Sequence, residues 1–304
     1  MSPAPINAET QLVGLIGWPI EHSVSPAMHN AAFAELGLNW RYVPLPVRPR
    51  EVESAARGLA ALGFLGANVT VPHKEATIRA VEQISGPDAV ASDARTLGAV
   101  NTLVVKRNGD GETSIKGRNT DVAGFLGALK DGGFHPESTT AVVVGAGGAA
   151  RAVVFGLLHA GAESIVVLNR SRGHAEALVS DLASTSGNAA PRALHALPLR
   201  RETLIETTRA AQLLVNATPV GMWPYVDCSI WPEEVPLPSH VTVFDLVYNP
   251  VRTKLLRLAR ASGANGIEGL GMLVGQGALA FAMWTGQEAP VSTMRVACSQ
   301  ALRG

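Results

Sequence analysis

The sequence predicts an α/β protein with two domains. Its 304 residues are enough for two domains that each bury a core. Short apolar runs alternate with helical patterns, which is typical of a mainly parallel sheet covered by helices. Hydrophobic residues make up 47% of the chain and charged residues 16%, as expected of a well-buried globular enzyme.

The first domain begins with predicted strands separated by predicted helices. We expect strands over 11–17, 40–47 and 66–72, and helices over 25–37 and 50–63. Ser25 is predicted to cap the first helix and Pro26 to occupy its first position, as is common at helix starts. The polar, glycine-rich stretch 106–117 predicts a hairpin near the end of this domain.

A second alternating unit follows a predicted helix from Asp121 to about Lys130. Residues 139–171 have the pattern strand, glycine turn, helix, strand, which is one βαβ module. The apolar runs 211–218 and 240–248 are expected to extend the same sheet. The second domain is therefore predicted to contain a parallel sheet.

Charge and composition disfavour nucleic-acid and membrane partners. Twenty-five basic residues balance twenty-five acidic ones without a basic block. Residues 1–11 lack the pattern of a signal peptide, and the uncharged run 269–287 contains five glycines and Gln276, which favours a buried helix. Cys228 and Cys298 are expected to be free thiols. We expect a cytoplasmic protein that acts on a small molecule and holds no metal.

A glycine turn predicts a dinucleotide site. An apolar strand enters the turn and a helical pattern leaves it, which is the context that this motif requires. Glycines allow the backbone to approach a pyrophosphate, whose charge the first amides of the helix can meet. The turn comprises Gly145, Ala146, Gly147, Gly148 and Ala149, with Ala150 at the third position of the motif. The alternative is a turn that serves packing only.

The end of the next strand favours NADP over NAD. NAD-dependent enzymes normally place Asp or Glu there against the ribose hydroxyls. This chain has Asn169, Arg170 and Ser171 instead. No carboxylate would repel a 2′-phosphate, and a guanidinium can pair with one. The alternative for Arg170 is a solvated arginine at a helix start.

Lys74 lies just beyond the third predicted strand. Ligands of open α/β sheets bind outside the carboxyl ends of strands, so this position suits chemistry. Ser23 and Ser25 lie at another strand-to-helix turn, where they could hold a carboxylate, although capping alone is the commoner role. Asn101 and Asp121 belong to two further polar clusters. Local sequence patterns do not show whether these clusters lie close together in the fold.

Seven motifs occur in the order seen in shikimate dehydrogenases, and the chain resembles that family from about Leu12 to about Met294. They are GWPIEHSVSPAMHN, NVTVPHKEA, GAVNT, RNTDVAGF, GAGGAAR, NATPVGM and GLGMLVGQGALAF. The resemblance implies NADPH-dependent reduction of 3-dehydroshikimate to shikimate, on the way to chorismate and aromatic amino acids. It also implies two α/β domains flanking a cleft: a substrate domain over 1–120, completed by C-terminal helices in 269–304, and a Rossmann domain over 121–268.

The resemblance assigns roles to residues that match the family's motifs. Lys74 is implied to be the catalytic lysine and Asp121 its acidic partner, which also contacts the substrate. The other implied substrate contacts are Ser23, Ser25, Thr70, Asn101, Tyr248 and Gln276. The implied cofactor contacts are Gly145 to Ala149, Asn169, Arg170, Ser171, Arg172, His174, Leu246 and Gly269.

The sequence departs from the family's cofactor loop at two positions, and two alternative functions stay open. Ser171 replaces the family's usual threonine, and His174 stands where a second arginine is usual, although Arg172 could substitute for it. His73 is expected to orient the lysine loop, and Tyr248 could be ordinary core. The alternatives are an NAD-dependent quinate/shikimate dehydrogenase and a catalytically silent paralogue that binds shikimate or NADP. A monomer or a homodimer is expected.

Overall fold

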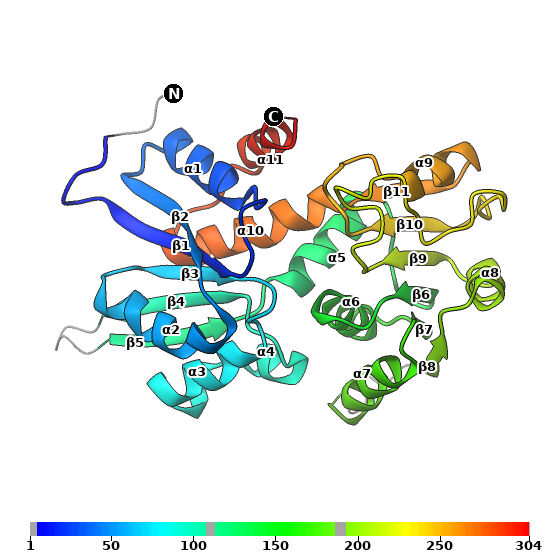
Figure 1. Cartoon of the computed structure of the whole chain (residues 1–304), viewed down its shortest axis with the longest axis horizontal. Helices are drawn as coiled ribbons and strands as arrows, with labels where there is room; N and C mark the ends of the chain where they lie inside the picture. The colour runs from blue at the N-terminus through cyan, green and yellow to red at the C-terminus, as the bar shows by residue number, and fades with distance from the viewer. Residues whose placement is uncertain (1–4, 108–112, 186–192, 304) are drawn as a thin grey trace. The chain divides into compact units, whose positions relative to one another are not determined.

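The chain forms two compact units in the computed structural model, which describes residues 5–107, 113–185 and 193–303. The first unit contains the chain up to Thr120 together with the chain from Gln276 onward. The second unit contains Asp121–Gly275. Figure 1 labels the helices and strands of both units.

The first unit is built on a five-stranded sheet of order β2-β1-β3-β4-β5. Its strands are β1 (Gln11–Gly17), β2 (Trp40–Pro46), β3 (Gly66–Val69), β4 (Thr102–Arg107) and β5 (Thr113–Arg118). β1 runs parallel to β2 and β3, but β4 runs antiparallel to β3 and to β5. The sheet is therefore mixed, because β4 and β5 form the predicted hairpin; its turn, 108–112, lies outside the described residues.

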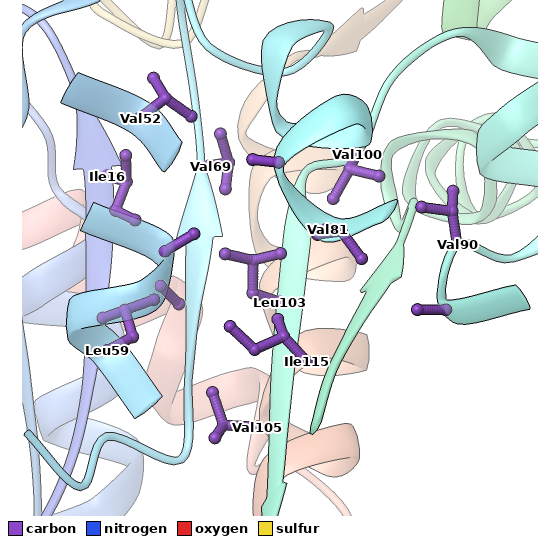
Figure 2. Packing of buried hydrophobic residues seen from close by; sticks show 14 of the residues in the cluster. Ile16, Val52, Leu59, Val69, Val81, Val90, Val100, Leu103, Val105 and Ile115 are labelled. Atoms are coloured by element: carbon purple, nitrogen blue, oxygen red, sulfur yellow. The ribbon is translucent and has the colours of Figure 1, made fainter. Parts of the chain in front are cut away.

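The helices of the first unit bury apolar faces on this sheet. They are α1 (Ser25–Glu35), α2 (Val52–Ala61), α3 (Ala76–Ser85), α4 (Ser92–Leu97), the part of α10 (Leu270–Thr285) from Gln276 onward, α11 (Val291–Ala301) and two short 3₁₀ helices, η1 (Pro49–Glu51) and η2 (Pro87–Ala89). Figure 2 shows Val52 and Leu59 of α2 and Val81 of α3 in one cluster of buried residues with Leu103 of β4 and Ile115 of β5. On other elements, α11 packs against α1, and the Trp284 ring nitrogen of α10 donates to the Leu103 carbonyl, 2.9 Å away.

The second unit is built on a six-stranded sheet of order β11-β10-β9-β6-β7-β8, in which every pairing is parallel. Its strands are β6 (Thr140–Val144), β7 (Ser164–Asn169), β8 (Ala193–Pro198), β9 (Leu213–Asn216), β10 (Thr242–Asp245) and β11 (Asn265–Glu268). Counted from β6, this is the order 3-2-1-4-5-6 of dinucleotide-binding sheets. The strand order reverses between β6 and β9, which is where such sheets bind their ligand.

The helices of the second unit lie before, between and after these parallel strands. They are α5 (Asp121–Asp131), α6 (Gly148–His159), α7 (Arg172–Thr185), α8 (Arg201–Arg209) and α9 (Lys254–Ala261), together with the first turns of α10. The continuous apolar run of β6 is buried almost throughout, as expected of a central parallel strand. In the part of the chain that the structure describes, no helix is long and apolar enough to cross a bilayer.

Candidate active site

Lys74 lies in the turn between β3 and α3, in the first unit. Its side chain is half-buried, and its carbonyl accepts the Val100 N–H, 2.9 Å away. The preceding residue, His73, is 1% exposed, and its Nε2 lies 2.7 Å from the Val47 carbonyl oxygen. This bond ties the lysine turn to the end of β2, which agrees with an orienting role for His73.

The two predicted serines lie at the start of α1, but their local roles differ from the prediction. The helix begins at Ser25, its N-cap is Val24, and no side chain caps it. The prediction that Ser25 caps this helix is therefore wrong. The Ser25 N–H instead faces Ser23 Oγ at 3.3 Å. Ser25 is buried and Ser23 is half-buried, because the chain turns into the helix one residue earlier than expected.

Behind Ser25 lies a buried tyrosine that sequence reasoning missed. The Tyr42 hydroxyl donates to Asn68 Oδ1 at 2.9 Å, and its ring stacks on His29 with centroids 4.4 Å apart. Burial raises the pKa of the Tyr42 phenol, and a hydrogen bond with the Ser25 side chain opposes that shift. Tyr42 therefore stays neutral and connects the serine turn to β3.

Asn68 continues this connection to the polar residues at the start of β4 and after β5. Its Nδ2 donates to Thr102 Oγ1 at 3.2 Å, and Thr102 Oγ1 donates to Asn101 Oδ1 at 3.0 Å. Asn101 Oδ1 also accepts the Thr120 N–H at 2.8 Å, and Asn101 Nδ2 donates to Thr120 Oγ1 at 3.0 Å. Thr120 Oγ1 in turn lies 3.5 Å from Gln276 Oε1. We call the set Tyr42, Asn68, Thr102, Asn101, Thr120 and Gln276 the polar network.

The polar network unites residues from motifs that lie far apart in the sequence. Asn101 and Gln276, both predicted substrate contacts, meet the same threonine, Thr120. Thr120 directly precedes Asp121, which is buried and begins α5 in the second unit. The Asn101 side chain thus fixes the backbone that leads into the predicted catalytic acid.

Replacing Tyr42 by phenylalanine tests whether the Tyr42 hydroxyl stabilises the polar network. The change leaves Asn68 Oδ1 buried without its donor, so we expect the free energy of unfolding to fall by about 1–3 kcal/mol. Urea denaturation measures this change. Tyr225→Phe is the matched control, because Tyr225 is 74% exposed and the same deletion should change stability by less than about 0.5 kcal/mol. Equal stability of both variants would show that the phenol does not hold Asn68.

The predicted glycine turn follows β6 in the second unit. Gly145 has φ +119°, and a Cβ there would lie 2.9 Å from the Ala217 carbonyl oxygen, so only glycine fits this position. Helix α6 begins at Gly148 without a side-chain cap, and the backbone of Gly147 to Ala149 is exposed. Uncapped amides at a helix start suit an anionic group such as a pyrophosphate. The residues present therefore fit a dinucleotide.

The predicted ribose-phosphate residues follow β7. Asn169 Nδ2 donates to the Ser171 carbonyl at 3.0 Å, which shapes the turn into α7, and Arg170 is exposed beside it. Arg172 Nε donates to Glu176 Oε1 at 2.7 Å, one helical turn away. Arg172 thus already has an acidic partner, so Arg170 is the better candidate for a 2′-phosphate. His174 is exposed on the same helix.

The backbones of Leu246 and Gly269, two further predicted cofactor contacts, approach each other closely in the second unit. A Cβ on Gly269 would come within 2.4 Å of the Leu246 carbonyl oxygen, so the close approach requires glycine. The Leu246 N–H donates to the Asn216 carbonyl at 3.0 Å. Tyr248 is half-buried two residues further on, so it is not ordinary core. All these residues follow the carboxyl ends of parallel strands, where ligands of such sheets bind.

Sequence reasoning missed several buried polar residues, among them Tyr42, Asn68 and Asp245. Asn68 and Asp245 sit in apolar runs, where a single polar residue was the available signal. Tyr42 gave no signal, because a tyrosine in a strand is ordinary core. The cysteines agree with the expectation of free thiols: Cys228 is exposed, and burial raises the pKa of Cys298 to about 11.

A dinucleotide-type parallel sheet joined to a mixed sheet that carries a lysine turn defines the class of two-domain, dinucleotide-dependent dehydrogenases. Models of three domains match: the shikimate dehydrogenase substrate binding domain over 15–103, shikimate / quinate 5-dehydrogenase over 129–224 and the shikimate 5′-dehydrogenase C-terminal domain over 269–297. The shikimate dehydrogenase (NADP(+)) of Methanopyrus kandleri is 48% identical over 299 residues, which cover 98% of each chain. The chain belongs to the shikimate dehydrogenase family.

Solved structures of the same family resemble the whole chain. Shikimate 5-dehydrogenase from Thermus thermophilus, crystallised with NADP(H) and shikimate, has a TM-score of 0.80 at 39% identity, covering 96% of this chain and 99% of that one. Quinate dehydrogenase from Corynebacterium glutamicum, crystallised with NAD, has a TM-score of 0.82 at 32% identity, covering 95% and 98%. The fold alone therefore does not separate the two activities.

Proposed function

We propose that this protein catalyses the reversible, NADPH-dependent reduction of 3-dehydroshikimate to shikimate, in the pathway to chorismate and aromatic amino acids. The observation that carries the proposal is the polar network of the first unit. Asn101 and Gln276, assigned to the substrate from separate motifs, share Thr120 as a hydrogen-bond partner. A small carboxylated polyol needs several hydroxyl and amide partners, and this network places such groups together.

The proposed chemistry divides between the two units. NADPH, when bound, supplies a hydride to the ketone carbon. The ammonium group of Lys74 stabilises the negative charge that develops on the ketone oxygen and transfers a proton to it, and the amine accepts that proton in the reverse direction. Asp121 is the acidic partner of Lys74. Ser23 and Ser25 bind the ring carboxylate. Tyr42 hydrogen-bonds both Ser25 and Asn68 and so positions Ser25.

Purified wild-type protein tests the function directly. We expect 3-dehydroshikimate to cause loss of NADPH absorbance, and shikimate with NADP⁺ to drive the reverse reaction. Quinate with NAD⁺ tests the quinate/shikimate dehydrogenase alternative, which predicts faster turnover with that pair. Tight binding of shikimate or NADPH without turnover would instead favour a silent binding paralogue.

Replacing Arg170 by glutamine tests the cofactor preference. A charged hydrogen bond to the 2′-phosphate would be lost, so we expect kcat/KM for NADPH to fall about tenfold or more, with kcat/KM for NADH unchanged. Steady-state kinetics with both cofactors measures the ratio. Arg172→Gln is the matched control, because Arg172 is already paired with Glu176 and its loss should matter less. An equal fall for NADPH and NADH would exclude a role of Arg170 in phosphate recognition.

We further propose a cytoplasmic enzyme whose partners are its substrate and cofactor, acting as a monomer or a homodimer. The balanced charge and the lack of a basic block support the absence of a nucleic-acid partner. Light scattering of the purified protein tests the oligomeric state.

A further inference from the structure

Asp245 is a buried carboxylate to which the proposed reaction assigns no role. It is the last residue of β10 and is 0% exposed. Its register partners on the neighbouring strands are Asn216, at the end of β9, and Glu268, at the end of β11. Aspartate is almost never fully buried unless it is paired. Among the residues that the structure describes, no lysine or arginine forms an ion pair with Asp245.

Three neutral donors surround this carboxylate instead. Asn216 Nδ2 and the Val247 N–H donate to Oδ1, at 2.9 and 3.1 Å, and Thr253 Oγ1 donates to Oδ2 at 2.6 Å. Burial raises the pKa of Asp245 to about 6, and the three hydrogen bonds oppose that shift. The three hydrogen bonds favour the ionised side chain. Hydrogen bonds to an ionised acceptor are about twice as strong as neutral ones.

Each donor belongs to a different segment. Asn216 shapes the loop after β9, because its Nδ2 also donates to the Val220 carbonyl at 3.1 Å and its Oδ1 accepts the Thr218 hydroxyl at 2.6 Å. Thr253 caps α9 by accepting the Leu256 N–H at 3.2 Å. Val247 lies in the loop after β10. One carboxylate thus ties together two loops and a helix start.

The tied loops carry residues assigned to both ligands. Val247 lies between Leu246, assigned to the cofactor, and Tyr248, assigned to the substrate. Ala217, next to Asn216, closes the glycine turn, since its N–H donates to the Val144 carbonyl at 2.9 Å and its own carbonyl faces Gly145. Two donors of Asp245 are therefore chain neighbours of these residues: Asn216 precedes Ala217, which contacts the glycine turn, and Val247 precedes Tyr248.

We propose that Asp245 is a positioning residue of the reaction, which holds the loops after β9 and β10 in place before either ligand binds. The inference rests on the proposed function. A loop that is correctly placed only part of the time lowers apparent affinity by that fraction, without changing the chemistry once both ligands are bound. We call Asp245 and its three hydrogen-bond donors, Asn216, Val247 and Thr253, the clamp. Loss of the clamp should therefore raise KM for both ligands and leave kcat nearly unchanged.

Variants of Thr253 and Asp245 in the full-length protein test the clamp. Thr253→Val removes the hydroxyl at nearly constant volume, so we expect KM for shikimate and for NADP⁺ to rise about tenfold or more, with kcat within about twofold. Thr253→Ser keeps the hydroxyl and should restore both values. Asp245→Asn keeps the cap of α9 but loses the anion, so it should raise both KM values by a smaller factor of about three.

Thr208→Val is the matched control, because Thr208 is a fully buried threonine of the same unit whose hydroxyl has no hydrogen-bond partner in the described part of the chain. It should leave all kinetic constants unchanged. Thermal denaturation of each variant separates the clamp from a purely structural role. A Thr253→Val variant that melts at a lower temperature but keeps wild-type KM values below its transition overturns the inference.

A second readout separates this inference from the proposed function. Fluorescence titration with NADPH measures cofactor binding without turnover, and Thr253→Val should weaken it about as much as it raises KM for NADP⁺. Wild-type protein that binds NADPH but does not oxidise shikimate refutes the proposed function and leaves this titration valid. Active wild-type protein with unchanged NADPH affinity in Thr253→Val refutes the clamp alone.

Discussion

Replacing Lys74 by alanine is expected to lower kcat/KM for shikimate by about 10² to 10⁴, which is the usual cost of removing a positioned acid–base group. NADPH binding should stay near wild type, because the predicted cofactor residues all belong to the second unit. Single-turnover kinetics and fluorescence titration with NADPH measure the two effects separately.

Two further lysine variants refine this result. Lys74→Arg keeps a positive charge but cannot release a proton at neutral pH, so it separates charge stabilisation from proton transfer. We expect it to recover only part of the lost rate. Lys106→Ala, at an exposed lysine of β4 in the same unit, serves as the control and should keep full activity. Turnover like wild type in Lys74→Ala would remove Lys74 from the mechanism.

Replacing Asp121 by asparagine is expected to lower kcat/KM by about 10² or more, because Lys74 loses its proposed acidic partner. Asparagine keeps the volume of aspartate and loses only its charge in the first turn of α5, which costs about 0.3–1 kcal/mol, so thermal stability should change little. The comparison of melting temperature with turnover separates the chemical role of Asp121 from a role in stabilising the start of α5.

Asp131→Asn provides the matched control at the other end of the same helix. Asp131 is exposed, and it lies in the last turn of α5. The same change of charge and volume there should leave kcat/KM within about twofold. If Asp121→Asn lost stability and kept its activity, Asp121 would stabilise the start of α5 and have no part in the reaction.

The start of the second unit, from α5 to β7, could be predicted well from the sequence. The β-branched run of β6, the glycine turn and the helical pattern of α6 all depend on neighbouring residues, so a short window contains the information. Strand direction in the first unit was harder to predict. The predicted hairpin over 106–117 makes β4 antiparallel to β5, but no local pattern indicated that β4 also runs antiparallel to β3.

The helix starts show where local patterns mislead. A serine followed by proline predicted a cap at Ser25, yet the helix already includes this residue and Ser23 lies within reach of its amide. The two conformations differ by one residue of backbone and leave the same serines at the turn. In the observed conformation Ser25 is buried and hydrogen-bonds Tyr42.

The sequence by itself determined the family and the two α/β units, because motifs and periodicity are properties of short segments. Only the tertiary structure decided which buried polar residues pair with one another. Asn68 meets Tyr42 across 26 residues, and Asp245 meets Asn216 across 29. Such pairs form because a buried polar group must find a partner, and the partner is whichever group the packed strands bring within 3 Å.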